Sequence, residues 1–463
     1  MEFGSVVFLL RFLPIFLITY YLVPGRMKNV ILLLGSLCFF SWGSPVCLMP
    51  LLISAGSSYV HGLLIERHLG KPTARILLVS AYCFDLVLLL VFGYAEFFIK
   101  SANEFLGTKL IGSGFPVPLG ITIYTLQGLS YVTDVSRGKC KACRNVFYYF
   151  TYLTMFPQLA AGPIVRYQEL QAPLRERKVE LHQVSEGFKR ICIGLAKKIL
   201  LADSAGMLWS SIVAMKPEGM SLATAWLGML AYAFEVYFTF SGYCDVAIGL
   251  GKCIGFDFPE NYDHPFAACS ITDFTERWNK SLMRWMKDYV YRPLAGEKKG
   301  LFPKLFFMLV TWALIGAWYG PDWTFVLWGI WIGFLFILES LFLGKILSTL
   351  PKVVGWCYAM LAISVGWVLL AMNDLSDAVT YFQVMFGAKG VGMVDHAFFF
   401  LASENILTLI IGGFFALPIF RGVLDRLDAS KNGMGIALKR LLEKIYPGVF
   451  LLASLVYLIG RGW

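Results

Sequence analysis

Residues 270–333 read SITDFTERWNKSLMRWMKDYVYRPLAGEKKGLFPKLFFMLVTWALIGAWYGPDWTFVLWGIWIG, and they join a dense run of charge to a dense run of tryptophan. In the first part, charged positions recur at intervals of three and four residues, which is the period of one helix face. These positions are Asp273, Arg277, Lys280, Arg284 and Asp288. Ser270 with Asp273 predicts the start of an amphipathic basic helix, and Pro293 predicts its end.

The second part of this stretch is apolar and predicts a helical hairpin. Its arms run from Leu305 to Trp318 and from Trp323 to Leu341, and they are joined by Tyr319-Gly320-Pro321-Asp322. Glycine followed by proline favours a turn at this point. The stretch therefore predicts a basic helix that leads into a pair of apolar helices.

The composition is that of an integral membrane protein. Of 463 residues, 58% are hydrophobic and only 15% are charged, whereas a soluble protein carries about 25% charged residues. The net charge of +10 follows the rule that basic residues collect in cytoplasmic loops, and no nucleic-acid partner is expected. Cys140 and Cys143 form a lone CxxC without a second pair, so no metal site is expected.

Repeated apolar segments predict an all-α polytopic protein, organised as one domain over residues 1–463. A span needs about 20 predominantly apolar residues. The candidate segments are 6–23, 29–43, 46–65, 76–99, 116–133, 145–164, 194–213, 221–243, 305–319, 323–344, 353–371, 398–420 and 446–460.

The basic loops predict a topology with the N-terminus outside. Counting spans places the basic residues 166–190 on the wrong side unless segment 145–164 is re-entrant, and its Pro157 is consistent with a broken helix. The long basic loop 244–304 then lies inside, and the acidic loop 372–397 lies outside.

Five acidic residues fall within or next to the predicted spans, where burying a charge is costly and indicates either an internal partner or a function. They are Asp85, Asp203, Glu235, Asp245 and Glu339.

Several segments, in order and spacing over residues 1–345, resemble the membrane-bound O-acyltransferase family. They include Pro118–Thr122, Phe156–Arg166, Phe240–Asp245, Arg277-Trp278 and Thr324–Gly329. The resemblance is closest to the branch of the bacterial alginate and cellulose O-acetyltransferases.

This resemblance implies a ring of 11–12 transmembrane helices with re-entrant helices around a central funnel, with the motif-bearing core at about residues 100–345. It implies a multi-pass protein of the bacterial plasma membrane, surrounded by membrane lipid. An acyl group, usually acetyl, would pass from acyl-CoA (acetyl-CoA), a co-substrate rather than a bound cofactor. The acceptor would be an exported glycan or a serine-esterase-like partner acyltransferase.

The chain departs from the family at its histidines. The near-universal histidine of the hairpin is replaced by Tyr319, and two further positions that are often histidine hold Asn279 and Ile332. A general base for attack on a thioester needs a pKa near 7, which an ordinary histidine has and an ordinary tyrosine does not. Tyr319 can instead donate a hydrogen bond to a carbonyl oxygen. The catalytic candidates are therefore Tyr319, Asn279 and, as a substitute base beside Asp263, His264.

The other four histidines are expected to be interface or loop residues. They are His61, His68, His182 and His396. The predicted substrate-binding residues are Gln158, Asp245, Asp273, Arg277, Trp278, Arg284 and Trp318. Basic residues of loop 244–304 suit the phosphates of the donor; the alternative is a helix that lies on anionic lipid headgroups.

Three functions follow as hypotheses. The first is a working O-acyltransferase in which Tyr319, Asn279 or His264 has adapted to the chemistry. The second is a non-catalytic family member that acts as a scaffold or acyl conduit in an exopolysaccharide-modification complex. The third is an unrelated transporter, suggested by the broken segment at Pro157.

Overall fold

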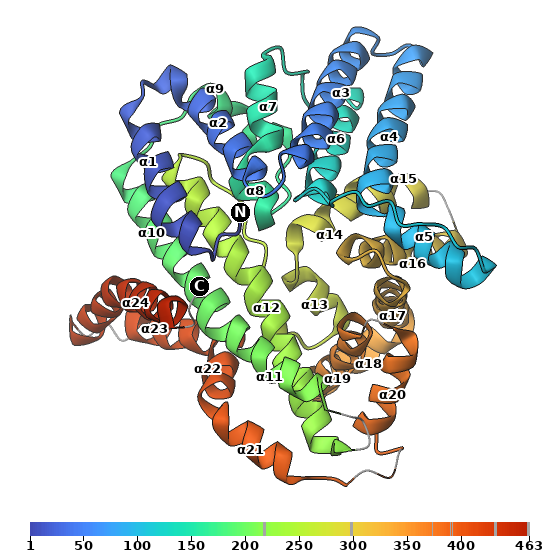
Figure 1. The fold of residues 1–463 in the computed structure, drawn as a ribbon, viewed down its shortest axis with the longest axis vertical. Coiled ribbons are helices and arrows are strands. Elements are labelled where there is room, and N and C mark those ends of the chain that lie inside the picture. The colour runs from blue at the N-terminus through green and yellow to red at the C-terminus, as the bar shows by residue number, and fades with distance from the viewer. Residues whose placement is uncertain are drawn as a thin grey trace. The chain divides into compact units, whose positions relative to one another are not determined.

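The computed structural model describes residues 1–215, 219–296, 300–372, 374–388, 390, 392–429 and 433–460. Throughout these residues the regular structure is helical, without a β-strand (Figure 1). The predicted all-α fold is confirmed.

The helices belong to two compact units, Met1–Ile191 with Cys244–Pro259 and Cys192–Tyr243 with Glu260–Trp463. The one domain expected over residues 1–463 stays a prediction. The first unit holds α1 (Leu13–Leu22), α2 (Lys28–Ser41), α3 (Leu48–Arg67), α4 (Pro72–Gly93), α5 (Ala95–Leu106), α6 (Ile121–Ser136), α7 (Val146–Thr154), α8 (Phe156–Ala161), α9 (Tyr167–Arg175) and most of α10 (Leu181–Ala196). The second unit holds α11 (Asp203–Val213), α13 (Ile271–Arg277), α14 (Lys280–Met286), α15 (Arg292–Ala295), α16 (Leu301–Tyr319), α17 (Trp323–Leu338), α18 (Gly344–Thr349), α19 (Lys352–Ala371), α20 (Leu375–Met385), α21 (His396–Glu404), α22 (Ile406–Ala416), α23 (Ile419–Ala429) and α24 (Gly433–Gly460). The long helix α12 (Leu222–Cys253) has residues in both units.

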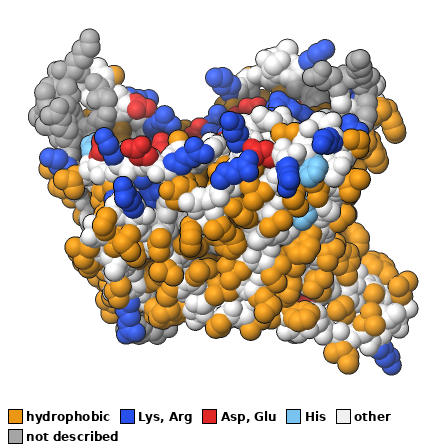
Figure 2. Space-filling model, turned by 90° about the horizontal axis from the view of Figure 1, so that it is seen from above, with side chains coloured by type: hydrophobic (Ala, Val, Ile, Leu, Met, Phe, Trp, Pro, Cys, Tyr) orange, Lys and Arg blue, Asp and Glu red, His pale blue; other side chains and the backbone are white. Residues whose placement is uncertain are grey.

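Five helices of the described chain are long and apolar enough to cross a membrane: Pro45–Arg67, Pro72–Gly93, Leu301–Tyr319, Trp323–Thr349 and Lys352–Ala371. Hydrophobic side chains cover most of the face shown in Figure 2, as expected of a protein immersed in lipid. The multi-pass membrane character is confirmed. The ring of 11–12 helices around a funnel stays a prediction, because several expected spans are short or broken in the described residues.

Two boundaries differ from those expected. The segment 398–420 is not one straight span, because α21 and α22 meet at a bend of 66°. The segment 221–243 continues as α12 to Cys253, so the loop expected at 244–304 begins about ten residues later. The extension packs closely on α10: a Cβ added to Gly249 would lie 2.5 Å from the carbonyl oxygen of Gly187. This close packing favours continuing the helix.

The hairpin of α16 and α17 is confirmed, and glycines let its two helices approach closely. A Cβ added to Gly316 would lie 2.2 Å from the Phe325 carbonyl oxygen, and one added to Gly329 would lie 2.2 Å from the Trp312 carbonyl oxygen. Small residues at such crossings bring helix backbones together in membranes. The close pairing fixes where α16 ends, and therefore where Tyr319 stands.

Segment 145–164 is broken as expected, into α7 and α8. Met155 leaves the helical conformation with φ −54° and ψ 109°, and Pro157 stands in the first turn of α8. Residues 151–159 are all buried. Irregular backbone at membrane depth is tolerated where protein buries it, so the break agrees with a re-entrant segment, whose return to the same side stays a prediction.

Candidate functional site

The basic stretch is not one helix, and this corrects the periodicity argument. It forms α13 and α14, separated at Trp278 and Asn279, and then a π-helical turn (Lys287–Tyr291) and α15. Pro293 therefore stands in the first turn of α15 and does not end a longer helix. Asn279 has φ 42°, in the left-handed region that asparagine tolerates better than most residues.

The break is held by backbone hydrogen bonds to an earlier segment. The Lys280 amide donates to the carbonyl of Asn261 at 3.0 Å, and the Asp263 amide donates to the carbonyl of Arg277 at 3.0 Å. These bonds replace the intrahelical bonds that a continuous helix would make. The break turns the side chains of residues 278 and 279 toward the end of α16.

Tyr319, Trp278 and Asn279 meet there and are called the Tyr319 centre. The Trp278 indole Nε1 donates to Tyr319 Oη at 2.8 Å, and the Asn279 amide Nδ2 donates to the same oxygen at 3.2 Å. The Tyr319 ring also packs edge-on against Trp318 and Trp328, with centroids 5.2 Å and 5.1 Å away. The buried Trp318 Nε1 has no hydrogen-bond partner among the described residues.

These contacts limit what Tyr319 can do. A phenol oxygen accepts about two hydrogen bonds, and here two N–H donors occupy it. The oxygen is therefore poorly placed to accept a further proton as a general base, whereas its O–H group can act as a donor. The structure thus brings together two of the three catalytic candidates, and the geometry favours an electrophilic role.

A cavity of about 620 Å³ lies between α13–α15 and the hairpin. Lys280, next to Asn279, and Ile315, one helical turn before Tyr319, both line it, so it adjoins the Tyr319 centre. Its charged lining consists of Lys280, Arg284, Lys287, Arg292, Glu276 and Asp288, and its apolar lining includes Met283, Met286, Met308, Trp312, Ile315 and Phe336. Four basic against two acidic groups leave the charged lining net positive.

Of the predicted substrate-binding residues in the basic stretch, Arg284 lines this cavity. Sequence reasoning did not place Lys280, Lys287 and Arg292 among the site residues. The spacing of Lys280 and Arg284 by one helical turn was the signal that could have found Lys280. Lys287 follows Arg284 by three residues, so the same helical spacing could have found it as well. Arg292 comes directly after the π-helical turn, which the sequence pattern did not indicate.

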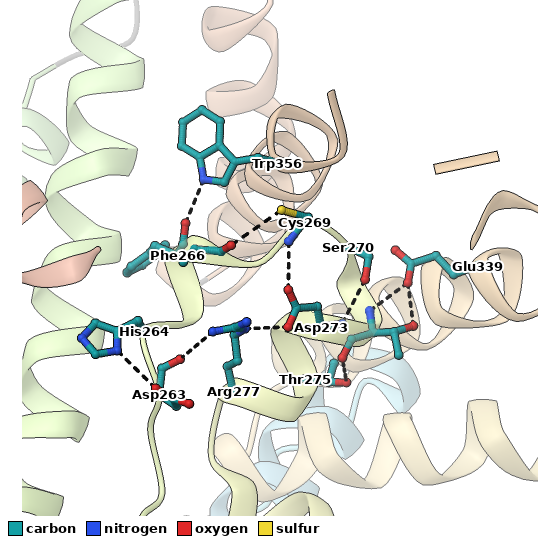
Figure 3. Close-up of polar contacts among 12 residues, drawn as sticks. Asp263, His264, Phe266, Cys269, Ser270, Asp273, Thr275, Arg277, Glu339 and Trp356 are labelled. Atoms are coloured by element: carbon teal, nitrogen blue, oxygen red, sulfur yellow. Dashed lines mark hydrogen bonds and ion pairs between the residues drawn. The ribbon is translucent and has the colours of Figure 1, made fainter. Parts of the chain in front are cut away.

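Asp273 and Arg277 hold the start of α13 (Figure 3). Ser270 caps the helix by accepting from the Asp273 amide at 3.0 Å, as expected. The Asp273 carboxylate accepts from Arg277 Nε at 2.5 Å and from the Cys269 amide at 3.1 Å. Arg277, the last residue of α13, also donates to the Asp263 carbonyl at 3.4 Å. A role of Asp273 or Arg277 in substrate binding stays a prediction.

Glu339, near the end of the α17 arm, binds the N-terminus of α13 (Figure 3). Its carboxylate accepts from the amides of Ile271 at 2.6 Å and Thr272 at 2.8 Å, and from the Thr272 hydroxyl at 2.6 Å. A carboxylate at a helix N-terminus is favoured by the unpaired amides and the helix dipole. This buried acid therefore has an internal partner, and it ties α13 to the hairpin.

His264 pairs with Asp263, with 3.2 Å between Nδ1 and Oδ1 (Figure 3). Burial alone would raise the pKa of Asp263, but the bond from His264 and the positive charges of Lys280 and Arg277 bring it below the usual range. In the described residues His264 makes no hydrogen bond with the Tyr319 centre, so its role as a base stays a prediction.

Gln158 and Asp245 belong to the first compact unit, and their roles in substrate binding stay predictions. Gln158 accepts from Gln127 Nε2 at 2.9 Å and donates to the Tyr152 carbonyl at 3.0 Å. Asp245 lies within α12 and accepts from Arg190 at 2.7 Å.

Two further acids of the spans also have polar neighbours. Asp203 pairs with Lys198 at 2.5 Å, and Asp85 accepts from Ser54 at 2.9 Å.

Outside the spans, burial raises the pKa of the Cys140 thiol to about 12, so this thiol stays protonated at neutral pH. A protonated thiol is a poor nucleophile.

Comparison with known proteins gives consistent matches. The model of "MBOAT, membrane-bound O-acyltransferase family" matches residues 118–381. A protein of Pseudomonas putida described as "Probable alginate O-acetylase AlgI" is 36% identical over 395 residues, covering 83% of this chain and 80% of its own. Its counterpart in Azotobacter vinelandii is 34% identical over 89% of this chain and 83% of its own. The "Peptidoglycan O-acetyltransferase" of Helicobacter pylori is 27% identical over 84% of this chain and 81% of its own.

Proposed function

The chain belongs to the membrane-bound O-acyltransferase family, and from this we propose that it transfers an acyl group, acetyl in the first instance, to an exported polysaccharide or cell-wall glycan. The donor is a cytoplasmic thioester, acyl-CoA. One observation carries the proposal: the Tyr319 centre, at the position of the family histidine, adjoins a cavity with a net positive charged lining and an apolar wall.

The cavity suits an acyl thioester of coenzyme A. Lys280, Arg284, Lys287 and Arg292 can bind phosphate groups by charge-assisted hydrogen bonds. Met308, Trp312 and Phe336, from the hairpin, suit the apolar parts of the donor. A volume of about 620 Å³ lies within the range of ligand pockets, roughly 300–1,000 Å³.

Tyr319 supports the chemistry as a hydrogen-bond donor. The acceptor hydroxyl oxygen forms a bond to the thioester carbon, the carbon–sulfur bond breaks, and the hydroxyl proton leaves with the thiol. Negative charge develops on the carbonyl oxygen in the transition state, and a donor placed there typically contributes about 10²–10³ in rate. Trp278 and Asn279 hold the phenol oxygen for this purpose.

The acceptor side is inferred from the relatives. The names of the relatives concern alginate, peptidoglycan and teichoic acid, all of them outside the cytoplasm. A serine-esterase-like partner that takes up the acyl group before the glycan does is the second acceptor of the proposal. The multi-pass chain would then lie in the bacterial plasma membrane, in contact with its lipid.

A second candidate function is a scaffold or acyl conduit without catalysis. It is favoured by the simultaneous replacement of three family histidine positions by Tyr319, Asn279 and Ile332. It is also favoured by the two donors on Tyr319 Oη, which leave that oxygen poorly suited to act as a base.

An acyl-transfer assay distinguishes the two candidate functions. The purified chain in detergent is supplied with radiolabelled acetyl-CoA and with alginate or peptidoglycan as the acceptor. Labelled ester on the glycan, together with release of free thiol above the protein-free rate, supports the acyltransferase. If only the double variant Tyr319→His and Asn279→His transfers label, the chain is the non-catalytic member. If the wild-type chain instead moves a solute across vesicles without any acyl chemistry, the transporter hypothesis holds.

A further inference from the structure

Asn261 is a buried polar residue beside the break between α13 and α14. Its side chain is 3% exposed, and the two residues that it contacts across the break, Asn279 and Ser281, are 5% and 4% exposed. Asn261 Oδ1 accepts from the Ser281 amide at 2.9 Å, and Asn261 Nδ2 donates to Asn279 Oδ1 at 3.2 Å. Sequence reasoning placed no function on Asn261.

These bonds fix which way each amide points. The backbone amide of Ser281 can only donate, so the Asn261 atom that faces it is oxygen. The NH₂ group of Asn261 must then face Asn279, and the Asn279 atom that meets it is oxygen. The NH₂ group of Asn279 is left facing Tyr319 Oη, at 3.2 Å.

We call the hydrogen bonds that join Ser281, Asn261, Asn279 and Tyr319 the relay. The orientation of the amide groups in the relay decides where the hydroxyl proton of Tyr319 points. If the Asn279 amide were turned over, its oxygen would face Tyr319 Oη and would accept the phenol proton. With the amide as found, Asn279 and Trp278 both donate to Oη, and the phenol proton points away from both. One asparagine thereby controls whether Tyr319 donates toward Asn279 or toward another acceptor.

We propose that Asn261 is a positioning residue of the acyl-transfer site: it orients Asn279 so that the Tyr319 hydroxyl donates a hydrogen bond to the carbonyl oxygen of the thioester. This inference rests on the proposed function. Asn261 itself touches neither substrate nor the reacting atoms; it acts through Asn279.

Substitution of Asn261 by aspartate tests the relay at nearly constant shape. The introduced carboxylate still accepts from the Ser281 amide, but it can no longer donate to Asn279. The Asn279 amide is then expected to turn over, so that its NH₂ group meets the carboxylate and its oxygen meets Tyr319. The matched control is Asn145→Asp: Asn145 caps α7 by accepting from the Tyr148 amide at 3.2 Å, a role that aspartate performs equally well.

The readout is the ¹⁹F resonance of 3-fluorotyrosine incorporated at position 319, recorded in detergent micelles. The resonance should move in Asn261→Asp and in Asn261→Ala, and it should stay in place in Asn145→Asp. The kcat for acyl transfer should fall by on the order of 10²-fold in Asn261→Asp, while KM for acetyl-CoA remains near that of the wild type. Lowering the pH from about 8 to about 5 should bring the Asn261→Asp resonance back toward the wild-type position, because a protonated carboxyl can donate again.

An unchanged resonance in folded Asn261→Asp would overturn the inference. If the resonance moves but the wild-type chain transfers no acyl group, the relay stands and the proposed function falls. If neither Asn261 variant folds, the wild-type chain still decides: the Asn279 NH₂ protons should show a nuclear Overhauser effect to fluorine at position 319. The absence of that effect would mean that the amide oxygen faces Tyr319, and the relay would be wrong.

Discussion

At the scale of single residues, the neighbours of Tyr319 matter as much as its identity. A tyrosine where the family resemblance predicts a histidine suggests a lost base. The donors Trp278 and Asn279 on its oxygen indicate instead an organised hydrogen-bond donor. The same substitution in a site without these donors would leave the phenol free to turn.

Removing the hydroxyl of Tyr319 tests this role. In Tyr319→Phe we expect kcat to fall by about 10²–10³-fold. We expect KM for acetyl-CoA to change little, because the lost bond forms mainly in the transition state. Steady-state assays of thiol release would measure both constants. Tyr59→Phe is the control, since its hydroxyl donates to the Arg144 carbonyl within the first compact unit. A full kcat in Tyr319→Phe would exclude the electrophilic role.

Asp395 offers a second test, on stability and pH. It caps α21 by accepting from the Phe398 amide at 2.7 Å, and it accepts from Ser221 and Thr224 at the start of α12. Burial would raise its pKa, but these hydrogen bonds lower it below the usual range. The stabilisation is therefore present above the unfolded pKa of about 3.9. It is lost as the pH falls through the lower pKa of the folded state.

Asp395→Asn should accordingly lower the free energy of unfolding by about 1 kcal/mol at neutral pH. The difference between the unfolding midpoints of variant and wild type should shrink as the pH falls below the unfolded pKa of about 3.9. Thermal unfolding in detergent at a series of pH values measures this. The exposed Asp257→Asn serves as the comparison and should match the wild type throughout. A difference that does not shrink as the pH falls below the unfolded pKa would contradict the assignment.

At the scale of elements, the site depends on short helices tied to a rigid pair. The hairpin of α16 and α17 presents Tyr319, whereas α13 and α14 present Trp278 and Asn279. Besides the bonds to Tyr319, Glu339 is a polar link between them, since it accepts three hydrogen bonds from the first turn of α13 (Figure 3). Helices as short as α13 have little stability of their own, so the link should matter for both folding and activity.

Glu339→Leu removes the carboxylate that accepts these three hydrogen bonds, and it leaves the buried Ile271 amide and the partly buried Thr272 amide without their partner. We expect a loss of about 2–4 kcal/mol in the free energy of unfolding, because a buried donor without an acceptor costs about 1–3 kcal/mol. Acyl transfer should fall as well, since α13 leads directly into Trp278. Glu404→Leu, at an exposed position of α21, is the control. Equal stability of the two variants would show that Glu339 does not hold α13.

At the scale of the whole molecule, the topology remains the main prediction. Basic loops place residues 134–144 and 166–190 on the cytoplasmic side only if the broken segment of α7 and α8 returns to the side it came from. The break at Met155 and the burial of residues 151–159 agree with such a return.

Labelling of single introduced cysteines with a membrane-impermeant maleimide tests this topology. Lys109→Cys should react in intact cells, because its loop is expected outside. Lys139→Cys and Lys178→Cys should both react only after the membrane is opened. All three positions are exposed, so accessibility within the protein does not bias the result. Labelling of Lys178→Cys from outside would mean that residues 145–164 cross the membrane completely.

The sequence by itself determined the helical, membrane-bound class, the hairpin, its turn at Tyr319 and the family. These features depend on local composition, on hydrophobic periodicity and on the order of motifs, all of which can be read from residues that are close together in the sequence. Only the tertiary structure decided that the basic stretch breaks at Asn279 and that α12 continues to Cys253. It also decided that Trp278 and Asn279 donate to Tyr319. The break exists because the backbone of residues 261–263 makes hydrogen bonds that replace those of a continuous helix. The periodicity of residues 270–291 does not indicate these bonds, because their partners lie in an earlier segment of the chain.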